Sequence, residues 1–509
     1  MMKRRILGGL AIAVAVGLAA LPAQAQKAQD TLRILFRDAV PNIDPYFNAQ
    51  RTGLILGHQA WDMLVHRDPA TFEIKPSLAT AWKLVDEKTL EFTIRKGVKF
   101  HDGSMLSAED VAYTINMASN PDSKVATPSN YAWIDKAEVT GPDTVTVRMK
   151  RPTPAALEYF ALVVPIHPKA YRERVGLEGF AKAPIGAGPY KIVKLEQAKE
   201  VVFERFADYW ADSPKGKPAI GKLHVRFVPD SATEMTELLS GRADWIWNLN
   251  PDQFGDVNKM PTLQAIRQES MRIGYLSIDA AGRSAPGNPL TNLKVRQAIW
   301  HAIDRQTFAE KLVTGGSRVP PAPCFPSQFG CDAEAAVKYA YDPAKAKALL
   351  AEAGFPNGFT IELVSYVQPT QWVAAVQNYL AAVGITAKIT HLQVAAAIAK
   401  AWRGENPLYM GSWGSYSIND VSAIMPVMFG GGNDDYARDP EVKRLLEEGG
   451  STADPAKRKA AYSAAIKRVT EQAYWLPLPT YVNTYGFVKT LDFKAFPDEL
   501  PRFYLAKWK

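Results

Sequence analysis

The chain contains residue types that catalyse reactions or bind metals, but their spacing forms no known active-site pattern. Its 509 residues include only seven histidines, and no two of them lie at the helical spacing of a metal site. The Gly-x-Ser-x-Gly nucleophile motif, the Ser-x-x-Lys pair and the phosphate-binding loop are also absent from the sequence. We therefore expect no catalytic residues, no bound metal and no cofactor.

Two short motifs suggest function at first sight but are better explained by backbone geometry. His101 and Asp102 are adjacent, so their side chains are expected to point apart, and Asp102-Gly103 is a turn signal. The segment Gly186-Ala187-Gly188 lacks the third glycine of a dinucleotide-binding loop. We interpret the first motif as structural and the second as a tight passage of the backbone.

Strand-like runs separated by turn residues recur in the first half of the chain, and the short runs at residues 201–203 and 223–228 predict a shared sheet. The strand-like runs cover residues 32–36, 89–95, 144–149, 201–203 and 223–228. Ser107 followed by Asp110 forms a capping box, which predicts a helix through Met117. Arg37 and Asp38 follow the first of these strands, a position that favours cleft residues in an α/β sheet.

Helix and strand signals alternate in the second half. Three helix starts are predicted where an aspartate precedes a proline, at Asp342-Pro343, Asp439-Pro440 and Asp454-Pro455. Gly354 and Gly384 are placed to end helices, and strand-like runs follow at residues 360–364 and 385–389. This alternation predicts a second α/β domain.

The N-terminus has the pattern of a secretory signal peptide. Lys3, Arg4 and Arg5 precede an apolar run over residues 6–21, and Ala23-Gln24-Ala25 is a small-x-small cleavage site. We expect cleavage after Ala25 and a mature protein that is free in the periplasm. Removal of these three cations lowers the formal charge of +8 by three, and the remaining charge forms no basic stripe, so we expect no nucleic-acid partner.

The only two cysteines are Cys324 and Cys331, within the segment CFPSQFGC. Neither has the partners of a zinc or redox motif. In an oxidising compartment we expect them to form a local disulfide; two free thiols are the alternative.

Several segments resemble, in order, the family 5 extracellular solute-binding proteins that serve peptide and nickel ABC importers. They are PSLA with Trp82, FTIRKGVKFHDG at residues 92–103, AEDV at 108–111, GAGPY at 186–190, ADYW at 207–210, GRAD at 241–244, and VRQA with AIDR at 295–305. The resemblance extends over nearly the whole mature chain. It implies an α/β fold of the type II periplasmic binding protein kind, with two lobes, a hinge and an enlarged, discontinuous first lobe.

The resemblance also implies a division of the chain. We expect a signal peptide at residues 1–25, a first lobe at 26–275 with an inserted subdomain at about 67–183, a second lobe at 276–482, and a return to the first lobe at 483–509. The ligand would lie between the lobes and favour the closed state by contacting both. The expected partners are this ligand and an inner-membrane ABC permease, and the protein is expected to be a monomer.

The sequence does not determine the identity of the ligand. Peptide-binding relatives pair the α-amino group of a peptide with an acid, but here Trp413-Gly414-Ser415-Tyr416 places a tyrosine where that acid would be. Asp420, Asp434 or Asp435 are possible substitutes. The candidate ligand-binding residues are Trp413, Ser415, Tyr416, Trp247, Asn248, Tyr131, Arg37 and Asp38.

A di- or oligopeptide is the first expectation for the ligand, on family frequency. An oligosaccharide, an opine, glutathione or a metal chelate is the alternative within the same transport role. A periplasmic hydrolase, which would need a convergent nucleophile and base, and a periplasmic chaperone, which would bind unfolded chains broadly, are the competing classes.

Overall fold

A ten-stranded sheet runs through the whole molecule. The structure, a computed structural model, describes residues 30–509, so the predicted signal peptide at residues 1–25 lies outside the described range. The strand order is β14-β13-β15-β12-β16-β11-β1-β10-β9-β8. Its members are β1 (Thr31–Phe36), β8 (Tyr190–Glu196), β9 (Glu200–Arg205), β10 (Lys222–Phe227), β11 (Trp245–Trp247), β12 (Leu263–Ile278), β13 (Phe359–Ser365), β14 (Ile385–His391), β15 (Leu408–Trp413) and β16 (Trp475–Val488).

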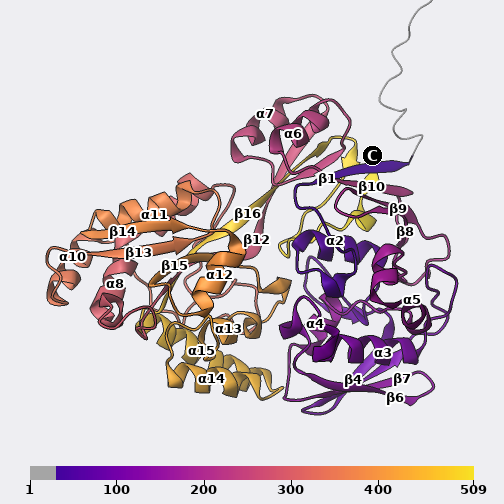
Figure 1. Cartoon of the computed structure of the whole chain (residues 1–509), viewed down its shortest axis with the longest axis horizontal. Coiled ribbons are helices and arrows are strands. Elements are labelled where there is room, and N and C mark those ends of the chain that lie inside the picture. Colours follow the sequence, from indigo (N-terminus) through magenta and orange to yellow (C-terminus); the bar gives the residue numbers. More distant parts are fainter. Residues whose placement is uncertain (1–29) are drawn as a thin grey trace, which may run out of the picture.

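Two long strands join the lobes. Strands β12 and β16 are antiparallel partners from Leu263 opposite Val488 to Ser277 opposite Trp475, and their register shifts between Glu269 and Tyr275. Figure 1 shows both strands crossing from the first lobe to the second. Because irregular pairing interrupts the ladder there, this segment is the natural place for a hinge.

The first lobe combines the β1 side of the sheet with an inserted α/β unit and the C-terminal residues. A second, antiparallel sheet has the order β4-β5-β7-β6. Both parts share one continuous core, which includes Leu32 and Ile34 of the main sheet and Phe92 and Phe160 of the insert. The further elements are η1 (Pro45–Phe47), α2 (Arg51–Ala60), β2 (Val65–Arg67), β3 (Ile74–Pro76), β4 (Ala79–Asp86), β5 (Thr89–Ile94), α3 (Ala108–Ser119), η2 (Pro121–Ser123), η3 (Pro128–Asn130), β6 (Ile134–Gly141), β7 (Thr144–Met149), α4 (Ala156–Leu162), α5 (Lys169–Lys182), α6 (Ser231–Leu239), η4 (Pro251–Gln253), α7 (Phe254–Lys259), β17 (Leu491–Asp492), η9 (Phe503–Leu505) and β18 (Lys507–Trp508).

The second lobe packs helices on both faces of its part of the sheet. Leu363 and Val364, neighbours on β13, belong to two different cores, because successive side chains of a strand point to opposite faces. The elements of this lobe are η5 (Pro289–Thr291), α8 (Leu293–Ala302), α9 (Arg305–Thr307), the π-helix η6 (Phe308–Val313), α10 (Pro343–Glu352), α11 (Gln371–Ala381), α12 (Val394–Trp402), η7 (Ser415–Ser417), η8 (Val421–Ala423), α13 (Met425–Phe429), α14 (Pro440–Gly450) and α15 (Pro455–Glu471).

The helix signals read from the sequence are confirmed. The side chains of Asp342, Asp439 and Asp454 accept hydrogen bonds from backbone N–H groups at the starts of α10, α14 and α15. Ser107 and Asp110 form the expected capping box of α3. Gly354 and Gly384 adopt positive φ angles of 90° and 98°, as left-handed residues that end helices do.

The histidine motif at residues 101–103 contacts the glycine motif at residues 186–188, and both have the structural role expected of them. His101 bonds to the Gly188 carbonyl at 3.0 Å through Nε2, and its Nδ1 accepts from the N–H of Gly186 at 3.2 Å. A Cβ on Gly186 would lie 2.0 Å from the carbonyl oxygen of Ala60. Only glycine therefore fits at position 186, and the hydrogen bonds of His101 hold this segment in place.

The sequence did not predict the two longest strands. Neither β12 nor β16 alternates polar and apolar residues along its length, because both are buried on two faces where they cross the centre of the molecule. The lobe boundaries inferred from the sequence fall within or beside these strands and stay a prediction. Among residues 30–509, no helix is both long and apolar enough to cross a bilayer.

Candidate functional site

A cavity of about 170 Å³ lies where the two lobes meet. The first lobe contributes the start of α2 with the segment before it, the loop around η3, and Val163. The hinge strand β12 contributes Arg272, and the second lobe contributes the loop after β15. The lining residues are Pro45, Asn48, Ala49, Gln50, Arg51, Leu54, Thr127, Asn130, Tyr131, Val163, Arg272, Trp413, Gly414, Ser415 and Tyr416.

The end of β15 and the loop after it form one wall of this cavity with two aromatic rings. Trp413 and Tyr416 meet edge to face with their ring centroids 5.4 Å apart. Trp413 packs on the second-lobe core and donates from Nε1 to the Ala423 carbonyl at 2.9 Å. Tyr416 packs on the first-lobe core instead, and burial raises the pKa of its phenol. The loop therefore spans the interface between the lobes.

Three consecutive residues of this loop adopt a left-handed backbone conformation. Ser415, Tyr416 and Ser417 have φ angles of 50°, 49° and 66°. Each such residue that is not glycine costs roughly 1–2 kcal/mol, so other contacts must hold the turn. Figure 1 places this segment, between β15 and α13, on the side of the second lobe that faces the first.

Contacts from the first lobe hold the turn. The Ser417 hydroxyl donates to the Asp498 carbonyl and accepts from Arg51 Nη1 at 2.7 Å. Arg67 donates from Nη1 to the Ser417 carbonyl, and Glu158 accepts from the backbone N–H of Asn419 at 3.0 Å. The conformation of the Tyr416 wall is thus coupled to the contact between the lobes.

Two arginines supply the charge in the cavity. Arg272 donates to Glu499 from Nε and Nη2 at 3.2 and 3.1 Å, and Arg51 Nη2 lies 3.1 Å from the same carboxylate. Burial would raise the pKa of Glu499, but the charges of both arginines outweigh it and hold this pKa below its usual value. One carboxylate therefore neutralises only one of the two guanidinium groups.

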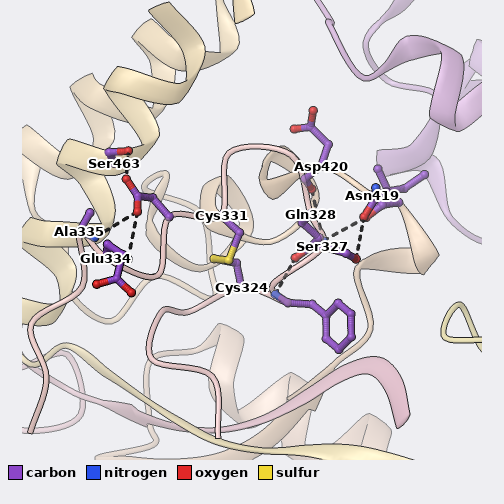
Figure 2. Close-up of a disulfide and its surroundings, with 12 residues drawn as sticks. Cys324, Ser327, Gln328, Cys331, Glu334, Ala335, Asn419, Asp420 and Ser463 are labelled. Atoms are coloured by element: carbon purple, nitrogen blue, oxygen red, sulfur yellow. Dashed lines mark hydrogen bonds between the residues drawn. A yellow bond between two sulfur atoms is a disulfide. The ribbon is translucent and has the colours of Figure 1, made fainter. Parts of the chain in front are cut away.

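The disulfide predicted from the sequence is confirmed, and it supports the site. Cys324 and Cys331 are bonded, with their Cα atoms 5.8 Å apart. Figure 2 shows the loop that they close lying against the segment that follows η7. Gln328 donates to the Ile418 carbonyl at 3.0 Å, and Phe329 pairs with Asp420 in a parallel bridge. The closed loop thus braces the segment that carries Tyr416.

Replacing both cysteines with alanine is expected to reduce stability and ligand capture together. Closing an eight-residue loop restricts the unfolded chain by about 2.5 kcal/mol of free energy at 25 °C. Urea unfolding of the Cys324→Ala/Cys331→Ala variant would measure that loss, and calorimetric titration would measure the weaker binding. The same urea midpoint for the oxidised and dithiothreitol-reduced wild type would contradict this role.

The structure brings together four of the candidate residues named from the sequence. Trp413, Ser415, Tyr416 and Tyr131 all line the cavity, and the Tyr131 hydroxyl donates to the Val163 carbonyl at 2.9 Å. Their role in binding stays a prediction.

The other candidate residues lie away from this cavity. Trp247 is buried beside Phe36 and Tyr485. Arg37 is bonded from Nε to the buried Glu234 at 2.8 Å. Asn248 and Asp38 are exposed and are not among the lining residues.

The three acids considered as substitutes at Tyr416 are engaged elsewhere. Asp420 binds Arg458 through both carboxylate oxygens at 2.9 Å. Asp435 accepts from the backbone N–H groups of Gly431, Ala437 and Arg438. Asp434 accepts from the indole of Trp402 at 3.2 Å. None of them lines the described cavity.

Sequence reasoning missed Arg51, Arg272 and Glu499. Arg272 had a usable signal, since a lone cation stands in the apolar run MRIGYLSI of a strand. The other two residues belong to ordinary polar segments and had no comparable signal.

Three comparisons relate this chain to known proteins. A family model described as bacterial extracellular solute-binding proteins, family 5, matches residues 73–457. The glutathione-binding protein GsiB of Salmonella choleraesuis (strain SC-B67) is 28% identical over 486 residues, which cover 92% of each chain.

Two solved structures share the fold. The binding protein AgaA from A. tumefaciens R10, in complex with agropinic acid, has a TM-score of 0.77 at 25% identity and covers 94% of this chain and 99% of its own. A dipeptide-binding protein from Pseudoalteromonas sp. SM9913, in complex with Met-Leu, has a TM-score of 0.78 at 23% identity and covers 94% of this chain and 100% of its own.

Proposed function

The chain belongs to the bacterial extracellular solute-binding proteins of family 5, the substrate-binding components of ABC importers, and on that premise we propose that it captures a short peptide or peptide-like solute between its lobes. The ligand then favours the closed arrangement because it contacts both lobes. A membrane permease receives the ligand from the closed protein. The protein acts as a monomer.

The observation that carries this proposal is the cavity between the lobes. It is bounded by residues of both lobes and of hinge strand β12, so an occupant contacts every part that must move on closure. Its aromatic and aliphatic walls, with a few polar groups and two arginines, suit a small organic solute with charged ends. The similarity to a glutathione-binding protein over most of both chains supports a peptide-like ligand.

Export to the periplasm is part of the same proposal. Residues 1–25 have the signal pattern, and the family functions outside the cytoplasm. Native mass spectrometry of protein purified from the periplasm tests both points in one experiment. We expect a chain that begins at Gln26 and an added mass that disappears on denaturation. A chain that keeps residues 1–25, or an unliganded protein that binds no peptide library, would contradict the proposal.

Replacing Trp413 with alanine is expected to weaken ligand binding about 30-fold, because a buried aromatic contact contributes about 2 kcal/mol or more to binding. Trp413 is partly exposed to solvent, so the stability of the unliganded protein should fall less than the loss of a fully buried tryptophan would cause. Calorimetric titration and urea unfolding measure the two effects separately.

The matched control for that variant is Trp402→Ala. Trp402 lies on the same lobe, is 52% exposed and does not line the cavity. It should leave the affinity unchanged. A Trp413→Ala variant with full affinity and a large loss of stability would assign this ring to the core.

A further inference from the structure

We infer that the ligand presents a carboxylate to Arg51 and Arg272 and has no free ammonium group beside it, so that it is an N-acylated amino acid or peptide. This inference rests on the proposed capture between the lobes and specifies the chemistry of the solute. It follows from the charges that face the cavity, the close approach of Gly414 to them and the nature of the remaining walls.

The charge that faces the cavity is positive. Arg51 and Arg272 are the only charged residues among the described lining residues. Their side chains are 17% and 29% exposed, whereas that of Glu499 is 6% exposed and is not part of the lining. The carboxylate therefore lies behind the guanidinium groups, and a solute entering the cavity meets the cations first.

A glycine lets the loop of the second lobe pack closely against the two cations. A Cβ on Gly414 would lie 3.0 Å from Arg272 Nη2 and 3.4 Å from Arg51 Nη2. Both Nη2 atoms therefore lie close to the backbone of Gly414, and a larger residue at this position would push the guanidinium groups away. Guanidinium N–H groups bind carboxylates strongly and with defined geometry. The two guanidinium groups, which line the cavity and are partly exposed, are therefore suited to bind a carboxylate of the ligand.

The cavity has no counterpart for an ammonium group. None of its described lining residues is Asp or Glu, and Asp420, Asp434 and Asp435 have partners elsewhere. An ammonium group near two guanidinium groups would be repelled, because like charges disfavour each other in a partly desolvated site.

The rest of the lining is suited to an uncharged substituent. Leu54, Val163, Tyr131 and Trp413 present aliphatic and aromatic surface. An acyl group on the amino nitrogen removes its charge and places apolar atoms against this surface. The solute is thus anionic at the arginines and apolar or neutral at the opposite wall.

Three matched dipeptide libraries test this inference on the mature protein after its co-purified ligand has been removed by unfolding and refolding. One library has acetylated amino groups and free carboxylates, the second has both ends free, and the third has acetylated amino groups and C-terminal amides. Native mass spectrometry reads the bound species. We expect the acetylated acids to bind at least tenfold better than the matched amides and the unblocked dipeptides.

Charge variants give a second, independent readout. Arg51→Gln and Arg272→Gln should each weaken binding of the acetylated acids by about 10- to 100-fold, as expected for a hydrogen bond to a charged group. Glu499→Gln should act in the opposite direction, whereas a purely structural role of this trio would weaken binding in all three variants. Arg403→Gln, at an exposed arginine paired only with Glu405, is the matched control.

The possible outcomes separate this inference from the proposed function. Equal binding of acids and amides, or a preference for unblocked dipeptides, overturns the inference while capture of peptides stands. Failure of all three libraries to bind, together with the absence of any co-purified adduct, overturns both. If Glu499→Gln does not fold, the libraries and the two arginine variants still test the inference.

Discussion

Replacing Asp498 with asparagine is expected to lower the free energy of unfolding by about 3–5 kcal/mol, because it leaves the buried Arg502 without its counter-ion and removes one of the two carboxylates that pair with Arg67. Asp498 is fully buried and accepts from Arg67 Nη2 at 2.8 Å and from Arg502 Nη2 at 2.6 Å. Arg67 and Arg502 are themselves almost fully buried. Urea unfolding of the variant, compared with the wild type at neutral pH, measures the loss.

The negative charge of Asp498 also makes the stability of the protein sensitive to low pH. Burial alone would raise the pKa of Asp498, but Arg502 and Arg67 outweigh it and hold this pKa well below its usual value. A carboxyl with a depressed pKa contributes stability above its unfolded pKa of about 3.9, and this contribution is lost as the pH falls toward the folded pKa. The difference between the wild type and Asp498→Asn should therefore be constant above about pH 5 and shrink below pH 4.

The control for this prediction is Asp492→Asn. Asp492 pairs with Lys507 at 3.6 Å on the surface, so its loss should cost less than about 1 kcal/mol. A loss at Asp498 that is as small as that at Asp492 would show that the buried network contributes little. Because the Asp498 carbonyl also accepts from Ser417, we expect the variant to bind ligand more weakly as well.

Replacing Gly186 with alanine is expected to cost about 3 kcal/mol, because overpacking against backbone cannot be relieved by a side-chain rotation. The added Cβ would lie 2.0 Å from the Ala60 carbonyl oxygen and 2.9 Å from Trp61 Cδ1. Any shift of this segment also disturbs the bonds between His101 and Gly186. The urea midpoint and the yield of periplasmic protein measure the effect.

Gly255→Ala is a matched control, for which we expect the opposite result to that of Gly186→Ala. Gly255 lies within α7, and a Cβ there would meet no atom within 4 Å. Alanine is favoured over glycine inside a helix by about 0.5–1 kcal/mol, so this variant should be slightly stabilised. If Gly186→Ala proved as harmless as Gly255→Ala, the close passage at Ala60 would not exist in solution.

The sequence by itself determined much of the local structure and the family. The aspartates that cap α10, α14 and α15, the left-handed Gly354 and Gly384, and the disulfide across eight residues all depend on neighbours in the chain. Such features need only a few adjacent residues, so a local pattern is enough to predict them. Trp413 and Tyr416, which line the cavity, were identified through the resemblance to the family.

Only the tertiary structure decided how the site is charged and which candidates reach it. Arg51, Arg272 and Glu499 come from three segments separated by more than 200 residues, and they meet because β12 and β16 bring the segments together. Trp247 is of a residue type that is common in clefts, but it lies in the core. The sequence of a three-residue strand does not show which face of that strand is buried. Charge and burial at such places depend on the packing of distant segments, and no local pattern in a sequence encodes that packing.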